Sequence, residues 1–183
     1  MNNIGIKGFQ AAGVAAGIKK NGKKDLGLIY STVPASVAGV FTRNRIQAAP
    51  VVLDRERIKS GTCQAIVVNS GNANCCTGRQ GMVDAEDMAG VVAEGLGIVG
   101  DKILVASTGV IGEPLPVEKI KVAVPELINT CRPEGISDLA QSIMTTDTVP
   151  KVVSAKGRID GKTFKITGIA KGAGMIRPDM ATM

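Results

Sequence analysis

Three short segments of the chain combine residue types suited to chemistry, and the first is ASTGVIG at residues 106–112. An apolar run leads there into Thr108 and Gly109, and Gly112 follows. A turn of this composition can direct consecutive backbone N–H groups and a hydroxyl toward one point, which is the arrangement that stabilises an oxyanion. The same pattern also ends ordinary strands, so this segment by itself leaves both interpretations open.

The second segment, VNSGNANCCTG at residues 68–78, is dense in asparagine and small residues. Its side-chain amides suit either ligand binding or hydrogen bonds to the loop's own backbone, as in Asx-turns. Cys75 and Cys76 lie in this loop, but a reactive thiolate needs a cation or a histidine beside it to lower its pKa. Neither flanks these cysteines, so a structural loop is the favoured interpretation.

The third segment, KGAGMIRPDMAT at residues 171–182, lacks the GK[ST] ending and the GxGxxG order of nucleotide-binding loops. It places Lys171 and a Gly-rich loop near Thr182. The chain contains no histidine, which excludes Ser-His-Asp and Cys-His catalysis within it. A threonine hydroxyl can instead use its own α-amine as base, because that amine titrates near ~7.7–8.0 and a lysine near ~10.4. Thr182 is therefore a candidate nucleophile.

Strands and helices must position these segments, and the first half of the chain predicts mostly sheet. Runs rich in Val and Ile, bounded by Gly, Pro, Asn or Ser, predict strands at residues 25–31, 36–42 and 64–70. Residues 84–96 have apolar positions at helical spacing behind an acidic first turn, with Gly97 as the stop signal. A compact strand at residues 102–108 then leads directly to Thr108.

The second half predicts helices followed by a hairpin. Pro125 must kink or end the first helix, because proline lacks the backbone N–H that a helix interior requires. Ser137 is expected to cap the second helix, which delivers the polar cluster at residues 145–148. The order of sheet, helices and sheet predicts one α/β layered domain. The expected elements are helices at 116–128 and 136–144 and strands at 151–156 and 163–171, joined through Asp160-Gly161.

Composition excludes several classes of protein. The 183 residues carry a net charge of +6, but the lysines are scattered and aromatic residues make up 2%, which disfavours nucleic-acid binding and suits a small anionic substrate. No apolar run approaches the ~18 residues that span a bilayer. The four cysteines, Cys63, Cys75, Cys76 and Cys131, form no CxxC pair and follow no secretory signal. Free thiols, a cytoplasmic location, no metal and no membrane partner are expected.

Seven longer motifs follow one another along the chain: GFQAAGVAAGIKK (8–20), DLGLI (25–29), VFTRNRIQAAPV (40–51), VNSGNANCCTG (68–78), STGVIGEPLP (107–116), MTTDT (144–148) and KGAGMIRPDMATM (171–183). In this set and order the chain resembles, essentially end to end, the N-terminal α chain of the glutamate N-acetyltransferases. These enzymes, also called ornithine acetyltransferases, are self-cleaving enzymes of arginine biosynthesis. Several long motifs in order make the resemblance specific.

The resemblance implies a precursor that is cut between Ala181 and Thr182, with Thr182 as the first residue of a separate β chain and as the nucleophile. It implies that Thr108 and Gly109 form the oxyanion hole. Thr145, Lys171 and Thr182 itself would contact the substrate. The isolated α chain is expected to be inactive.

The resemblance also implies a fold and a reaction. Residues 1–183 would form a single α-chain domain of a layered αββα-type sandwich, similar to N-terminal-nucleophile hydrolases but with its own topology, completed by the β chain in an α2β2 heterotetramer. Acetyl would pass from N2-acetylornithine to glutamate through an acetyl-threonine intermediate, in a ping-pong mechanism. No cofactor is implied, and acetyl-CoA remains open as a further acetyl donor.

Two other functions remain as alternatives. A self-cleaving aminopeptidase or amidase of related fold would use the same nucleophile but transfer the acyl group to water. A non-catalytic anion-binding module would use the Gly-rich loops without a nucleophile.

Overall fold

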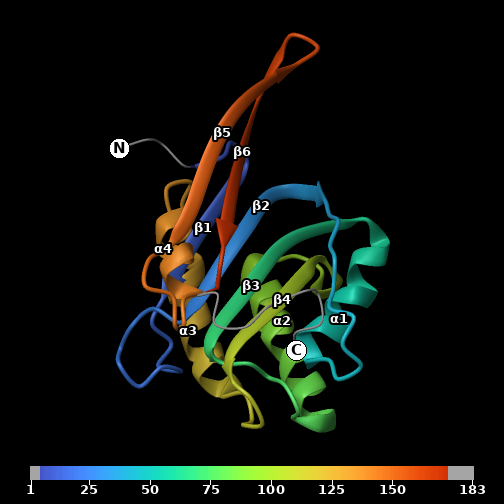
Figure 1. Ribbon diagram of the computed structural model, residues 1–183, viewed down its shortest axis with the longest axis vertical. Coiled ribbons are helices and arrows are strands. Elements are labelled where there is room, and N and C mark those ends of the chain that lie inside the picture. Colours follow the sequence, from blue (N-terminus) through green and yellow to red (C-terminus); the bar gives the residue numbers. More distant parts are fainter. Residues whose placement is uncertain (1–4, 173–183) are drawn as a thin grey trace.

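A four-stranded sheet lies at the centre of the computed structural model, which describes residues 5–172 (Figure 1). Its strand order is β1-β2-β3-β4, with β2 antiparallel to both of its neighbours, β1 and β3, and with β3 parallel to β4. Because β3 and β4 run in the same direction, the segments that follow them emerge at the same edge of the sheet. The strands are β1 (Phe9–Val14), β2 (Leu26–Ser36), β3 (Thr62–Asn72) and β4 (Ile103–Val110).

Two helices, α2 (Gly78–Leu96) and α3 (Val117–Asn129), cover one face of this sheet. Alternate residues of each strand point toward them, as the pleat requires. The resulting core is entirely aliphatic, apart from Met88. Its fully buried members include Leu28, Val67, Met88, Val92, Ile120 and Leu127.

The short helix α4 (Ile136–Ser142) packs on the opposite face, directly against backbone. Gly13 of β1 and Gly27 of β2 are cross-strand partners beneath it. A Cβ atom on Gly13 would lie 2.3 Å from the carbonyl oxygen of Asp138, and one on Gly27 would lie 2.2 Å from the Ser142 Oγ. The two glycines therefore allow α4 to pack directly on the sheet backbone. This packing fixes the point at which the chain leaves α4 toward Thr145.

A hairpin of β5 (Lys151–Ile159) and β6 (Lys162–Ala170) forms the second sheet, and its tip extends away from the central sheet in Figure 1. Its turn consists of Asp160 and Gly161, both with positive φ (49° and 77°), as the predicted two-residue turn requires. Val152 and Ile169 pack at its base against the α4 side of the sheet.

Helix α1 (Ala49–Arg57), followed by the single turn η1 (Ile58–Ser60), covers the free edge of β4. Asp54 Oδ1 accepts a hydrogen bond from the Val105 N–H at 3.0 Å, and Arg57 Nη1 donates one to the Ile103 carbonyl at 2.7 Å. Side chains of α1 thus replace the missing strand at this edge. A second single turn, η2 (Gly100–Lys102), precedes β4.

Most of the predicted elements are confirmed. Strands lie within or across 25–31, 64–70, 102–108, 151–156 and 163–171, and helices across 84–96, 116–128 and 136–144. Gly97 ends α2 in the left-handed conformation (φ 67°) that the stop signal predicts. The α/β layered architecture is also as predicted.

Two local expectations are wrong, and one of the two alternatives for Pro125, that it ends the helix, is excluded. Residues 37–42 form no strand, because β3 offers β2 no pairing partner beyond Ser36 and Thr62, and Val40 is 85% exposed. Ser137 does not cap α4, whose N-cap is Gly135 without a side-chain bond. Pro125 lies inside α3, which continues past it to Asn129.

The sequence patterns also missed two elements, β1 and α1. The first is built from Gly, Ala and Gln with few β-branched residues. The second has neither a capping side chain nor an acidic first turn, and Pro50 is its only fully buried residue.

Candidate active site

Four of the predicted site residues, from three separate elements, line one cavity of about 900 Å³. Thr108 and Gly109 lie at the end of β4, Thr145 lies in the loop that follows α4, and Lys171 directly follows β6. The structure therefore brings the predicted oxyanion segment and two predicted substrate contacts to the same place.

Gly109 lies too close to β3 to carry any side chain. It pairs with Gly71, its φ is 141°, and a Cβ atom built on it would lie 2.3 Å from the Gly71 carbonyl carbon. Two glycines facing each other let the carboxyl ends of β3 and β4 approach closely while Gly109 stays exposed to the cavity. The backbone of Thr108-Gly109 thus lines the cavity as an oxyanion site would require.

The asparagine-rich loop serves the protein's own backbone. Asn69 Nδ2 donates to the Asn72 carbonyl at 2.8 Å, and Asn72 Oδ1 accepts from the Asn74 N–H at 2.8 Å. Asn74 Nδ2 in turn donates to the Gly81 carbonyl in α2 at 2.7 Å. These buried amides support the structural interpretation of the loop.

Asp147 organises the loop that carries Thr145. Its side chain is 1% exposed and accepts hydrogen bonds from Lys151 Nζ and the Gly172 N–H, both at 2.7 Å. The Lys171 ammonium lies 4.0 Å from the same carboxylate and donates to Thr145 Oγ1 at 2.9 Å. The hydrogen bond from Lys151, with the backbone donors, holds the pKa of Asp147 well below its usual range. The carboxylate stays ionised and orients Lys171 toward Thr145.

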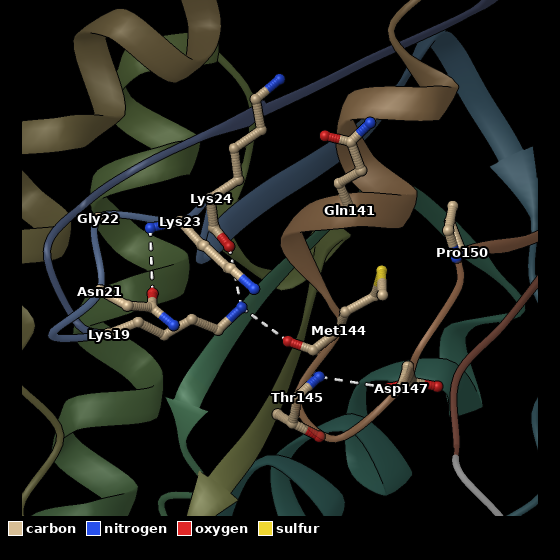
Figure 2. Close-up of a pocket in the computed structure, with 10 residues that line it drawn as sticks. All are labelled: Lys19, Asn21, Gly22, Lys23, Lys24, Gln141, Met144, Thr145, Asp147 and Pro150. Atoms are coloured by element: carbon tan, nitrogen blue, oxygen red, sulfur yellow. Dashed lines mark hydrogen bonds between the residues drawn. The ribbon is translucent and has the colours of Figure 1, made fainter.

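Lys19 is a cavity residue that sequence reasoning did not assign. Its Nζ donates to the Met144 carbonyl at 2.6 Å and to the Lys24 carbonyl at 2.9 Å, as Figure 2 shows. It thereby ties the loop before β2 to the residue that precedes Thr145. Burial lowers the pKa of Lys19, and the nearby charges of Lys23 and Lys171 lower it further. The sequence feature that could have identified Lys19 as a site residue is its position in the GFQAAGVAAGIKK motif.

Asp54 is a second cavity residue that the sequence did not reveal, because the helix that carries it was not predicted. It lies on α1 and lines the cavity, and its carboxylate also accepts the hydrogen bond from the Val105 N–H of β4. Burial raises the pKa of its carboxyl group to about 6.

All four cysteines are free, as predicted. Cys75 lines the cavity but is buried, and burial raises the pKa of its thiol, with Cys76 adding to the effect. A thiol in this setting is poorly suited to act as a nucleophile.

No group of three or more Cys, Asp or Glu side chains within residues 5–172 could hold a metal ion. Within the same part of the chain, no helix is both long enough and apolar enough to span a membrane. The predicted nucleophile Thr182 and the predicted cleavage partner Ala181 lie outside the described residues.

Comparison with known proteins gives the family. The model of the ArgJ family matches residues 10–183. The chain belongs to the ArgJ family.

Curated ArgJ relatives support this membership over nearly the whole chain. The arginine biosynthesis bifunctional protein ArgJ of Geobacter sulfurreducens is 52% identical over 98% of the chain, and that of Caldanaerobacter subterraneus subsp. tengcongensis is 55% identical over 97%. The chain spans only 46% and 44% of these two relatives, a little under half of their length.

Solved ArgJ structures have the same fold. The crystal structure of the ArgJ protein from Bacillus halodurans matches with a TM-score of 0.89 and 44% identity, over 95% of this chain and 91% of that one. Ornithine acetyltransferase from Mycobacterium tuberculosis, solved in complex with ornithine, matches with a TM-score of 0.88 and 38% identity, over 96% and 94% of the two chains. The α/β sandwich of the ArgJ family is therefore the fold of this chain.

Proposed function

We propose that this chain is the α chain of an enzyme that transfers acetyl from N2-acetylornithine to glutamate. The observation that carries the proposal is the meeting of Thr108-Gly109, Thr145 and Lys171 around one cavity in an ArgJ-family chain. These residues come from sequence positions up to 63 apart (171 − 108), so their meeting is a property of the fold. The solved relative from M. tuberculosis is an ornithine acetyltransferase that holds ornithine, which is consistent with this substrate.

Activation would begin with cleavage of the precursor. The Thr182 hydroxyl attacks the Ala181 carbonyl carbon, and the peptide C–N bond breaks as the acyl group moves from nitrogen to oxygen. Water then hydrolyses the ester, which leaves a carboxylate on Ala181 and a free α-amine on Thr182. That amine supplies the base that a chain without histidine otherwise lacks.

Acetyl transfer would follow in two half-reactions. The Thr182 hydroxyl gives its proton to the α-amine and attacks the acetyl carbonyl of N2-acetylornithine. The N–C bond breaks, ornithine leaves with the proton on its amine, and an acetyl ester remains on Thr182. The amine of glutamate then attacks this ester, which forms N-acetylglutamate and restores the hydroxyl. The Thr108-Gly109 backbone would stabilise the tetrahedral oxyanion of each half-reaction, where loss of one donor costs roughly 3–4 kcal/mol.

Lys171 would bind the α-carboxylate of either substrate, with Thr145 beside it. The ammonium is oriented by Asp147 and Thr145 before any ligand arrives, which reduces the entropy lost on binding. A lysine ammonium is a compact charge on a flexible side chain, which suits it to bind a substrate carboxylate.

A second chain from the same precursor would complete the site, in an α2β2 assembly located in the cytoplasm. Two observations support this proposal. The curated relatives are more than twice as long as the chain. The hairpin also exposes a series of large apolar side chains, as a surface that another chain covers would. These are Val153, Ile159, Phe164 and Ile166.

The test uses the complete protein that includes the sequence after Thr182. It should split at Ala181–Thr182, as mass spectrometry would report, and convert N2-acetylornithine and glutamate into ornithine and N-acetylglutamate. Thr182→Ala should abolish both splitting and transfer. An uncleaved protein that still transfers acetyl would contradict the assignment of the nucleophile.

Two further arms separate the alternatives. If ornithine release were equally fast without glutamate and gave only acetate, the protein would be an amidase. Absence of any acetyl chemistry would favour the anion-binding module. Replacing N2-acetylornithine by acetyl-CoA in the same assay determines whether the enzyme also uses that donor.

A further inference from the structure

A second pocket, of about 570 Å³, adjoins the cavity and is rich in hydrogen-bond donors. Lys19, Asn21 and Thr145 line both spaces. Figure 2 shows Lys23 reaching into this pocket, with its ammonium close to that of Lys19 in the view. Gln141 of α4 also lines this pocket.

The lysine side chains around Thr145 differ in whether a carboxylate pairs with their ammonium group. Lys24 is paired with Asp138, and Lys171 with Asp147. The carboxylate of Asp25 is buried and accepts the backbone N–H groups of Ala16 and Lys19, at 2.6 and 2.7 Å.

Lys23 is different, because within residues 5–172 its ammonium has neither a carboxylate partner nor a hydrogen-bond acceptor. Lys19 uses two of its three N–H donors on carbonyl groups, which leaves one for a ligand. Like charges placed together in a pocket favour the binding of an anion.

The amines contact different groups of the segment that carries Thr145. Lys171 reaches its hydroxyl, whereas Lys19 reaches the carbonyl of the residue before it. A ligand beside Thr145, which lines both spaces, could thus meet Lys171 in the cavity and Lys19 and Lys23 in the adjoining pocket. Glutamate carries two carboxylates separated by only three carbon atoms, whereas ornithine carries one carboxylate and an amine.

We propose that Lys23, assisted by Lys19, binds the side-chain carboxylate of the acceptor glutamate, while Lys171 holds its α-carboxylate. This proposal rests on the proposed function, because that function supplies glutamate as the acceptor. It assigns to the pocket a role in the second half-reaction and none in the binding of the acetyl donor.

The experiment compares Lys23→Gln and Lys23→Glu in the complete protein, with Lys20→Gln and Lys20→Glu as matched controls. Lys20 lies in the same loop and is exposed, as Lys23 is, but it lines neither pocket. Lys23→Gln should raise the KM for glutamate about tenfold, as expected for one lost charge-assisted hydrogen bond. Lys23→Glu should raise it further, and both Lys20 variants should match the wild type.

The first half-reaction and a second acceptor supply the internal controls. The KM for N2-acetylornithine, measured as ornithine release, should change less than about twofold in Lys23→Gln. Glutamine lacks the side-chain carboxylate, so wild type and Lys23→Gln should use it equally poorly.

Glutamate binding by calorimetry provides a readout that does not depend on turnover. Lys23→Gln should weaken this binding about tenfold and leave glutamine binding unchanged. If wild type bound glutamate but transferred no acetyl, the proposed function would fail, and tenfold weaker glutamate binding in Lys23→Gln would still identify Lys23 as a ligand of the side-chain carboxylate.

An unchanged glutamate affinity in Lys23→Gln would overturn the inference. So would an equal loss for glutamate and N2-acetylornithine, which would indicate a general structural effect. A KM raised for acetyl-CoA alone would show that the pocket binds a phosphate group of that donor instead.

Discussion

The Lys171 ammonium donates a hydrogen bond to the Thr145 hydroxyl at 2.9 Å, although the two residues are 26 positions apart in the sequence. Lys171 follows the hairpin and Thr145 follows α4, so the bond joins the end of the hairpin to the loop after α4 at the cavity. Asp147 contacts both residues: its Oδ2 lies 4.0 Å from Lys171 Nζ and accepts a hydrogen bond from the Thr145 backbone nitrogen at 3.3 Å. The loop that carries Thr145 is therefore an electrostatic unit whose parts should respond together to substitution.

Asp147→Asn should disturb this unit without changing its shape. The amide can still accept one of the hydrogen bonds but no longer attracts Lys151 and Lys171, so the KM for substrate should rise about tenfold. The free energy of unfolding at pH 7 should fall by roughly 1–3 kcal/mol. Denaturant titrations and steady-state kinetics on the complete protein measure both.

The pH dependence of the same variant has a definite sign. Asp147 has a lowered pKa when folded, so its stabilisation is present above the ordinary carboxyl pKa and is lost as pH falls toward the folded value. The difference between wild type and variant should shrink in strong acid. Asp101→Asn, at an exposed position, is the control; a constant difference from pH 7 to pH 2 would contradict the role given to Asp147.

Gly109→Ala should damage both the fold and the reaction. The added Cβ would lie 2.3 Å from backbone carbon of Gly71, at a φ of 141° that side chains rarely adopt. We expect a loss of roughly 2–4 kcal/mol in the free energy of unfolding and at least a ~100-fold fall in kcat. Gly90→Ala meets nothing within 4 Å in α2 and should be neutral or stabilising. Equal behaviour of the two variants would remove the argument for close strand approach.

Asp54→Asn should stabilise the protein at alkaline pH. Burial raises the pKa of Asp54 to about 6, above its ordinary 3.8, so its contribution to stability is complete below pH 3.8 and is lost as pH rises through about 6. Asparagine keeps an acceptor for the Val105 N–H and carries no charge. The variant should be about 1 kcal/mol more stable than wild type at pH 8 and equal to it near pH 4, after allowance for partial solvent screening.

Urea titrations at the two pH values test this expectation. Asp54→Ala is the informative companion, because it removes the acceptor as well as the charge and should be less stable than Asp54→Asn at both pH values. A wild type as stable at pH 8 as the Asn variant would show that the carboxyl group is well solvated.

The thiols should react in an order set by burial. Cys76 is exposed, whereas burial raises the pKa of Cys131 to about 11 and also raises that of Cys75. Iodoacetamide at pH 8 should therefore label Cys76 first, and Cys75 and Cys131 much more slowly, as peptide mass spectrometry would show. In denaturant all four should react at similar rates, and early labelling of Cys131 in the native protein would contradict its burial.

The sequence by itself determined the local structure and the chemical limits. Alternation and helical spacing reflect which side of each element is buried, so most strands and helices could be predicted. Asp160-Gly161 and Gly97 were also predictable, because their conformations depend on the residue itself. The absence of histidine excluded whole classes of mechanism before any fold was known.

Only the tertiary structure decided which residues meet. The need for glycine at position 109 comes from Gly71 on the neighbouring strand, and the ionised state of Asp147 comes from Lys151 and two backbone N–H groups. Asp54 was overlooked because α1 has little amphipathic signal and acquires its role by covering the edge of β4. Such contacts depend on how whole elements pack, and residue patterns within a single element carry no record of them.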